Sequence, residues 1–213
     1  MLVLGLDPSL TNYGWALHET TAKGVKRCVS RGRHQTSPRM LEVLRYMEHR
    51  EHVERLVREL TPDKVAIEYP VFNELYSSGM YGLFLYTFEA LYHVRADVVF
   101  LSNSSTKAVV RRYLDRPKGW GEITKQDMIE AAKKHTGPGR WSSDEADAYW
   151  IAVLGGRFWE HLGGAVSEDD LTDYEKKLFT EIHRPMRGRF AGKTLKKGLR
   201  YRQNDRFFLL SQL

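Results

Sequence analysis

An apolar run near the N-terminus ends abruptly in a carboxylate. Residues 2–6 read Leu-Val-Leu-Gly-Leu, and Asp7 follows them directly. A strand that is apolar on both faces is typical of the middle of a sheet, where an ionised carboxylate is costly unless it is paired or holds a metal ion. The run therefore predicts a buried strand with a binding partner for Asp7. The alternative is a turn aspartate that caps the local backbone ahead of Pro8.

A second short apolar strand, at residues 64–67, ends in Glu68 in the same way. Further along, Asp144 and Asp147 stand three residues apart at the predicted start of a helix, so both lie on one face of its first turns. Each acid also has an ordinary interpretation. Glu68 can be a strand end in solvent, and acids are favoured in the first turn of any helix by its dipole.

Apolar periodicity and turn residues predict the rest of the fold. The expected strands lie at 13–19, 24–36 and 97–101, and the expected helices at 40–60, 77–95, 105–114, 124–135 and from 142 onward. This order predicts an α/β domain over 1–162, with a mixed five-stranded sheet flanked by helices. An acidic linker or helix and a basic C-terminal extension are expected over 163–213.

The sheet order allows the strands ending at Asp7 and Glu68 to lie side by side, with Asp144 and Asp147 on a helix nearby. Four carboxylates that meet in this way need cations to stay ionised together. Oxygen-only ligands favour Mg²⁺ or Mn²⁺, and two such ions can drive an in-line displacement at phosphate. Because Cys28 is the only cysteine, an internal disulfide and a thiolate metal cluster are both excluded.

The positive charge of the chain is concentrated at its C-terminal end. The net charge is +6, yet residues 183–213 hold nine bases and one acid, a net charge of +8, which leaves the first 182 residues at −2. Such a tail suits contact with a polyanion such as nucleic acid. The alternatives are a solvated tail without a dedicated partner, or one in which residues 207–210 fold back onto the core. The bases are Arg184, Arg187, Arg189, Lys193, Lys196, Lys197, Arg200, Arg202 and Arg206.

The N-terminal run lacks the basic region of a signal peptide, and no window of the sequence has the length and apolarity of a membrane span. We therefore expect a soluble, cytoplasmic protein that has no membrane partner.

Several segments match one known family in their order and spacing over residues 1 to about 160. They are Gly5–Pro8 with Gly14, Ala66–Glu68, Lys107 in a Ser/Thr-rich segment, Lys125, and Asp144–Ala148. In these segments the chain resembles the RuvC-like Holliday junction resolvases of the RNase H-like nuclease superfamily. The resemblance implies an RNase H-like fold and a homodimer that makes paired, Mg²⁺-dependent cuts in four-way DNA. It also implies that Asp7, Glu68, Asp144 and Asp147 bind two metal ions, while Lys107 and Lys125 contact DNA or support the charge developing on phosphate.

The resemblance further implies an aromatic wedge at the junction shortly after the strand-end glutamate, a role for which Tyr69 and Phe72 compete. Other expected DNA contacts are Arg111, Arg112 and Lys118, together with the tail bases. The tail beyond 163 is outside the family's usual pattern, which indicates a divergent, phage-encoded member acting in the cytoplasm of a bacterium or a phage-infected host.

Three other functions compete with a strict resolvase. One is a broader branched-DNA or flap endonuclease, and another is a DNA-binding module without catalysis. The third is the actin-like ATPase and sugar-kinase fold, whose phosphate loop also follows a strand. That fold needs a second Asp-x-Gly turn and a second lobe, and this sequence offers neither, so we expect no nucleotide cofactor.

Overall fold

The computed structural model describes residues 1–20, 26–69, 78–117, 121–179, 182–185, 194–197, 200–203 and 206–209. Its centre is a mixed sheet with the strand order β3-β2-β1-β4-β5. The first three strands form an antiparallel meander, and β4 and β5 run parallel to β1. The predicted mixed five-stranded sheet is thus confirmed. The strands are β1 (Leu2–Asp7), β2 (Asn12–Thr20), β3 (Lys26–Gln35), β4 (Lys64–Glu68) and β5 (Val98–Leu101).

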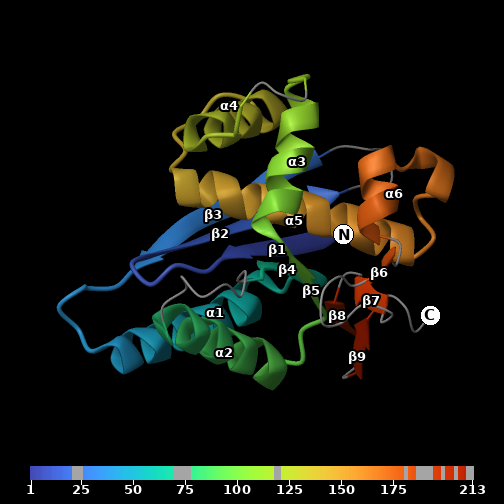
Figure 1. Ribbon diagram of the computed structural model, residues 1–213. Coiled ribbons are helices and arrows are strands. Elements are labelled where there is room, and N and C mark those ends of the chain that lie inside the picture. The colour runs from blue at the N-terminus through green and yellow to red at the C-terminus, as the bar shows by residue number, and fades with distance from the viewer. Residues whose placement is uncertain are drawn as a thin grey trace.

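Helices cover both faces of the sheet, as Figure 1 shows. The helix α1 connects β3 to β4, α2 connects β4 to β5, and both lie on one face, whereas α5 crosses the other face and has α3 and α4 packed beside it. The helices are α1 (Glu42–Leu60), α2 (Ser78–His93), α3 (Asn103–Tyr113), α4 (Lys125–Thr136) and α5 (Ser143–Leu162). Among the described helices, none combines the length and the apolar character needed to cross a membrane.

Strand alternation decides which side chains of β1 face α5. Leu4 and Leu6 belong to the core under α1 and α2, while Val3 belongs to the core under α5. Because side chains alternate along a strand, Gly5 and Asp7 share the α5 face with Val3. The first candidate acid therefore lies between the sheet and α5.

Small residues let α5 lie unusually close to the sheet. A Cβ on Gly5 would sit 2.0 Å from the carbonyl oxygen of Ala148, and one on Gly155 would sit 2.3 Å from the Cβ of Ala66. These positions are incompatible with any side chain unless the backbone moves. Glycine at both points therefore fixes the distance between α5 and the strands β1 and β4.

The start of α5 agrees with the expected cap, and the start of α3 differs from the prediction. Ser142 caps α5 in a capping box with Glu145, as the spacing predicts. The helix α3 begins at Asn103, two residues before the predicted position, because the side chain of Ser102 accepts a hydrogen bond from the backbone N–H of Ser105. The early cap brings Asn103 next to the end of β5.

The C-terminal extension enlarges the sheet. The strand β8 pairs antiparallel with β5, and β9 pairs with β8, so the sheet has seven strands among the described residues. The strands β6 and β7 form a separate two-stranded ribbon. These elements are η1 (Glu168–Asp170), α6 (Asp173–Phe179), β6 (Ile182–Pro185), β7 (Thr194–Lys197), β8 (Arg200–Gln203) and β9 (Arg206–Leu209).

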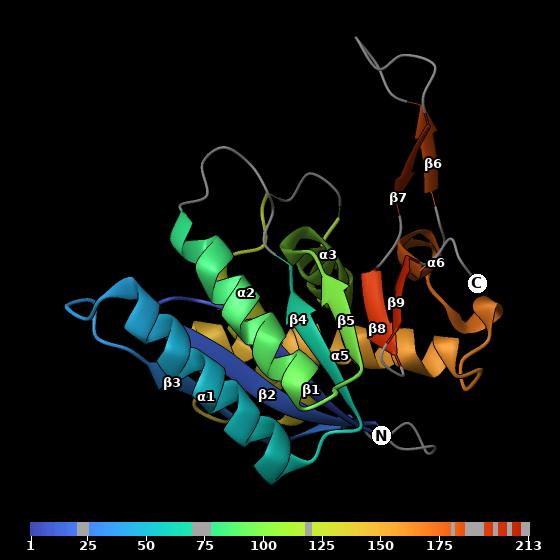
Figure 2. The same ribbon diagram turned by 90° about the horizontal axis from the view of Figure 1, so that it is seen from below.

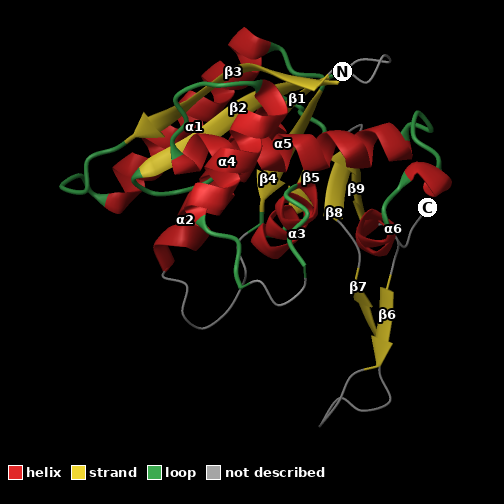
Figure 3. Ribbon diagram, turned by 90° about the horizontal axis from the view of Figure 1, so that it is seen from above, coloured by secondary structure: helices red, strands yellow, loops and turns green. Residues whose placement is uncertain are grey.

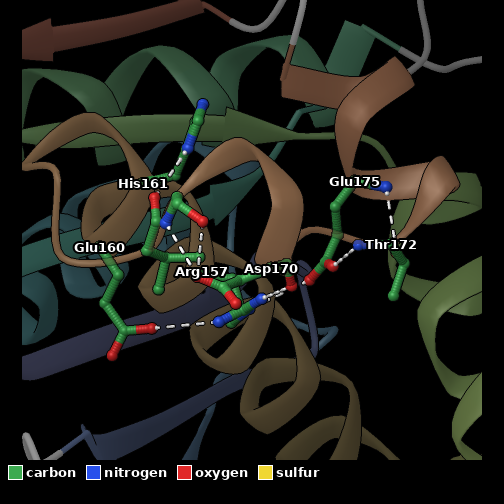
Figure 4. A network of polar contacts seen from close by, with 8 residues as sticks. Arg157, Glu160, His161, Asp170, Thr172 and Glu175 are labelled. Atoms are coloured by element: carbon green, nitrogen blue, oxygen red, sulfur yellow. Dashed lines mark hydrogen bonds and ion pairs between the residues drawn. The ribbon is translucent and has the colours of Figure 1, made fainter.

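A polar network fastens α6 to the end of α5 (Figure 4). The guanidinium group of Arg157 donates to the carboxylate of Glu175 at 3.2 Å and to the carbonyl oxygen of Asp170 at 3.0 Å. Glu175 in turn accepts from the backbone N–H of Thr172 at 2.8 Å. Since Glu175 is largely buried, this network holds the start of the extension in one position on α5.

Candidate active site

Two of the predicted acids end neighbouring strands. The register pairs Leu6 with Ile67 across the parallel strands β1 and β4, so Asp7 and Glu68 follow at the same edge of the sheet. Glu68 shares its face with Ala66, which packs under α5. Both carboxylates therefore lie at the carboxyl edge of the sheet, on the α5 side.

The other two acids approach this edge from the first turns of α5. A Cβ on Gly14 would sit 2.3 Å from the carbonyl oxygen of Asp144, so only glycine allows this contact. Gly14 is also the partner of Asp7 across β1 and β2. The start of α5 is therefore held directly over the end of β1. The close contact at Gly14 therefore brings Asp144 and Asp147 toward Asp7.

The acids of the site influence one another's ionisation. The pKa of Asp7 is raised well above its usual value, first by burial and then by the negative charges of Glu68, Asp147 and Asp144. Burial, with a further contribution from Asp147, raises the pKa of Glu68 to about 7. Burial likewise raises the pKa of Asp147 to about 6. Such groups ionise together only when positive charge is supplied.

Two lysines supply part of that charge. Lys125, the first residue of α4, lowers the pKa values of Asp7 and Asp147, and Lys107, in α3, lowers those of Glu68 and Asp147. The structure thus brings both predicted lysines to the four acids, from two helices that begin at the same end of the sheet.

Asn103 is a site residue that the sequence analysis missed. Its side-chain amide donates to both carboxylate oxygens of Glu68, at 3.2 Å each, which favours the ionised form of that acid. Glu68, Asn103 and Lys107 line a narrow crevice together with Asp147 and Thr106. The signal that could have found Asn103 is its position directly after β5, at the edge where β1 and β4 also end.

The donor set fits a hard divalent cation, because every candidate ligand is a carboxylate oxygen and the raised pKa values show the cost of leaving the acids uncompensated. Within the described part of the chain, no three acidic, His or Cys side chains converge at ligand distance. The four acids nevertheless influence one another's charge, since Glu68, Asp147 and Asp144 all raise the pKa of Asp7.

The predicted wedge residues have different outcomes. Tyr69 packs edge-on against Phe84 and Phe100, with ring centroids 5.3 and 6.1 Å apart, and belongs to the periphery of the core. This packing favours a structural role for Tyr69. Phe72 lies outside the described residues.

Two of the remaining predicted DNA contacts have partners within the described part of the chain. Arg111 donates to the carbonyl oxygen of Gly121, and Arg112 donates to the hydroxyl of Thr172 at 3.0 Å and stacks over Tyr174. Both arginines thus have structural partners on neighbouring segments. Of the other bases, Arg184 is in β6, Lys196 and Lys197 are in β7, and Arg200 and Arg202 are in β8, while Lys118, Arg187, Arg189 and Lys193 lie outside the described residues.

Comparison with known proteins identifies the fold. No protein-family model matches the chain, and no curated protein is significantly similar to it in sequence. Among solved structures, Thermus thermophilus RuvC superposes with a TM-score of 0.61 and 21% identity, covering 76% of this chain and 97% of RuvC. T. thermophilus RuvC in complex with Holliday junction substrate gives a TM-score of 0.58 and 17% identity, covering 72% and 91% of the two chains.

A more distant likeness has the same character. The yeast mitochondrial Holliday junction resolvase Ydc2 superposes with a TM-score of 0.50 and 12% identity, covering 70% of this chain and 75% of that one. Sheet order, helix placement and these superpositions agree, and the chain has the RNase H-like fold of the RuvC-type Holliday junction resolvases.

Proposed function

We propose that the chain is a metal-dependent, structure-selective DNA endonuclease that resolves four-way junctions by paired phosphodiester hydrolysis. The observation that carries the proposal is the meeting of four carboxylates and two lysines at one sheet edge, from β1, β4 and three helices. The structure of T. thermophilus RuvC with Holliday junction substrate supports the choice of substrate, since the two proteins share the fold that builds this edge.

Each group has a role in this proposal. Asp7, Glu68, Asp144 and Asp147 would hold two Mg²⁺ or Mn²⁺ ions, which when bound activate water and stabilise the leaving oxygen. Asn103 orients Glu68 and favours its ionised form through its two hydrogen bonds. Lys107 and Lys125 counter the negative charge that builds up on the phosphate during the displacement.

Paired cuts need two active sites, so the proposal includes a homodimer with twofold symmetry. The helix α2 offers a surface for it, because Leu85 and Tyr92 lie seven residues apart and are 63% and 56% exposed. Large apolar side chains in such a row are typical of interfaces. The phage origin and cytoplasmic location also remain predictions.

The test compares cleavage of synthetic four-way, three-way, flap and linear duplex DNA by the wild-type protein and by Asp7→Asn. We expect symmetric cuts in the four-way junction that require Mg²⁺ or Mn²⁺. Asp7→Asn should abolish cutting while junction binding persists, because the substitution removes charge with little change in volume. Equal cleavage of flaps and junctions would favour the broader endonuclease, and wild-type turnover by Asp7→Asn would refute the metal site.

A further inference from the structure

The C-terminal extension consists of two parts with different surroundings. The strands β8 and β9 continue the central sheet beyond β5. The strands β6 and β7 pair only with each other in the described sheets, and Figures 2 and 3 show this ribbon projecting from the body of the molecule. The superposition covers 97% of T. thermophilus RuvC and 76% of this chain. About a quarter of this chain therefore has no counterpart in that protein.

Both ends of the ribbon are anchored at the same point of the core. Phe179, just before β6, packs on Phe158 of α5 with ring centroids 5.6 Å apart, and Tyr201 of β8 packs on the same ring at 5.3 Å. Phe179 and Tyr201 are 2% and 1% exposed. The polar network around Arg157 holds the preceding helix as well. The described residues that precede and follow the ribbon therefore pack on the same part of α5.

The segment that forms the ribbon is strongly basic. Residues 182–197 contain six bases and no acid. Three of these bases lie in the described strands, where Arg184 is opposite Leu195, Lys196 opposite His183, and Lys197 opposite Ile182. Because the segment itself offers no carboxylate to neutralise them, the natural counter-charge is an external polyanion.

The direction of the ribbon selects the polyanion. In Figures 2 and 3 the ribbon extends beyond the same side of the molecule toward which β4 and β5 run, which is the side where Asp7 and Glu68 end their strands. A duplex with one phosphate at the acids can therefore continue toward the ribbon. Contacts to phosphates fix the position of a duplex without reading its sequence.

We propose that the β6–β7 ribbon is an arm that binds the phosphate backbone of duplex DNA leading away from the active site, and that β8 and β9 act as its anchor in the sheet. The inference rests on the proposed function only in its choice of DNA as the polyanion. The inference assigns DNA binding to the ribbon alone and not to the whole predicted extension, because the pairing of β8 with β5 gives the last strands a structural role.

The experiment measures binding of the full chain to a four-way junction and to linear duplex at several salt concentrations, with EDTA present so that no DNA is cut. The test variant replaces Arg184, Lys196 and Lys197 by Gln. If all three contact phosphates, the slope of log K against log salt falls by about 2.7 for both DNA shapes, at about 0.9 per contact.

The matched control replaces Arg55, Arg58 and Arg95, exposed residues of α1 and of the turn after α2, by Gln. It removes the same charge and should leave the salt slope unchanged. Equal changes of the salt slope in the two triple variants would overturn the inference. An unchanged salt slope in the ribbon variant, with a melting temperature equal to that of the wild type, would also overturn it. So would a ribbon variant that changes only the mass in light scattering, since that outcome points to a protein partner.

The two proposals fail separately. If the wild type cuts no DNA but the ribbon variant lowers the salt slope of binding, the proposed DNA-binding arm is supported and the proposed nuclease activity is refuted. If the wild type resolves junctions but the ribbon variant leaves the salt slope unchanged, the nuclease activity is supported and the DNA-binding arm is refuted.

Discussion

The contact between Gly14 and the start of α5 makes a quantitative prediction. In Gly14→Ala the new Cβ would sit 2.3 Å from the carbonyl oxygen of Asp144, whereas ordinary contacts begin at 3.4 Å. The first turn of α5 must therefore move by about 1 Å relative to β2, carrying Asp144 and Asp147 with it. A displacement of about 1 Å can lower the rate of a positioned reaction by about 100-fold.

The same overlap should cost stability. Overpacking of this kind typically costs about 1–3 kcal/mol, and for a chain of this length each kcal/mol lowers the melting temperature by about 2–4 °C. We therefore expect Gly14→Ala to melt several degrees below the wild type and to remain folded at 25 °C. Single-turnover cleavage of a four-way junction at that temperature would then be slower by about two orders of magnitude, with junction binding retained.

The control for this prediction lies in the same helix. A Cβ on Gly156 would meet its nearest neighbour, a methyl group of Thr20, at 3.5 Å, so Gly156→Ala fits without movement. Replacing a helical glycine by alanine stabilises by about 0.5–1 kcal/mol, and this variant should melt slightly higher with unchanged cleavage. Wild-type cleavage and melting of Gly14→Ala would refute the idea that close approach of α5 positions the acids.

Three further predictions concern the acids and the assembly. The pKa of Glu68 is raised to about 7 from its usual 4.5. Between pH 4.5 and 7 the folded, metal-free protein therefore binds more protons than the unfolded chain. The contribution of Glu68 to the free energy of unfolding is lost as the pH rises through that range. Thermal melts should show this loss in the wild type but not in Glu68→Gln. Mg²⁺ should raise the wild-type melting temperature at pH 8 and not at pH 4.5. If the melting temperatures of the wild type and Glu68→Gln changed with pH in parallel, the prediction would be contradicted. Asn103→Ala removes the hydrogen bonds that favour ionised Glu68, so the acid limb of the pH–rate profile should move to higher pH, while Ser104→Ala, at an exposed neighbouring position, should leave it in place. Light scattering at micromolar concentration should give about twice the chain mass of 24.7 kDa, Leu85→Asp should reduce it to the monomer, and a monomeric wild type would argue against the dimer.

The sheet and the positions of the acids could be predicted because their signals are local. The apolar runs before Asp7 and Glu68 give the strands directly, and two parallel strands that end alike bring their last residues to the same edge. The spacing of Asp144 and Asp147, with Ser142 and Glu145 as a capping box, gives the start of α5.

The parts that escaped prediction depend on contacts distant in sequence. Nothing local to Tyr201 indicates burial, since it stands between Arg200 and Arg202, yet it pairs with Val99 of β5. Asn103 reads as one of several possible caps, and its contact with Glu68 arises only because β4 and β5 are neighbours. A polar segment gives no periodic signal of its own, so its role is set by what the rest of the chain places beside it.

The pairing of β8 with β5 has a consequence for the order in which the protein can assemble. Phe100 pairs with Arg200, so one hundred residues must be synthesised after β5 before its outer edge finds its partner. Until then β5, an entirely buried strand in the finished molecule, presents unpaired backbone groups and apolar side chains, which is the condition under which sheet edges recruit other chains. Folding during synthesis should therefore be slowest at its last step, and a chain released early should aggregate through β5.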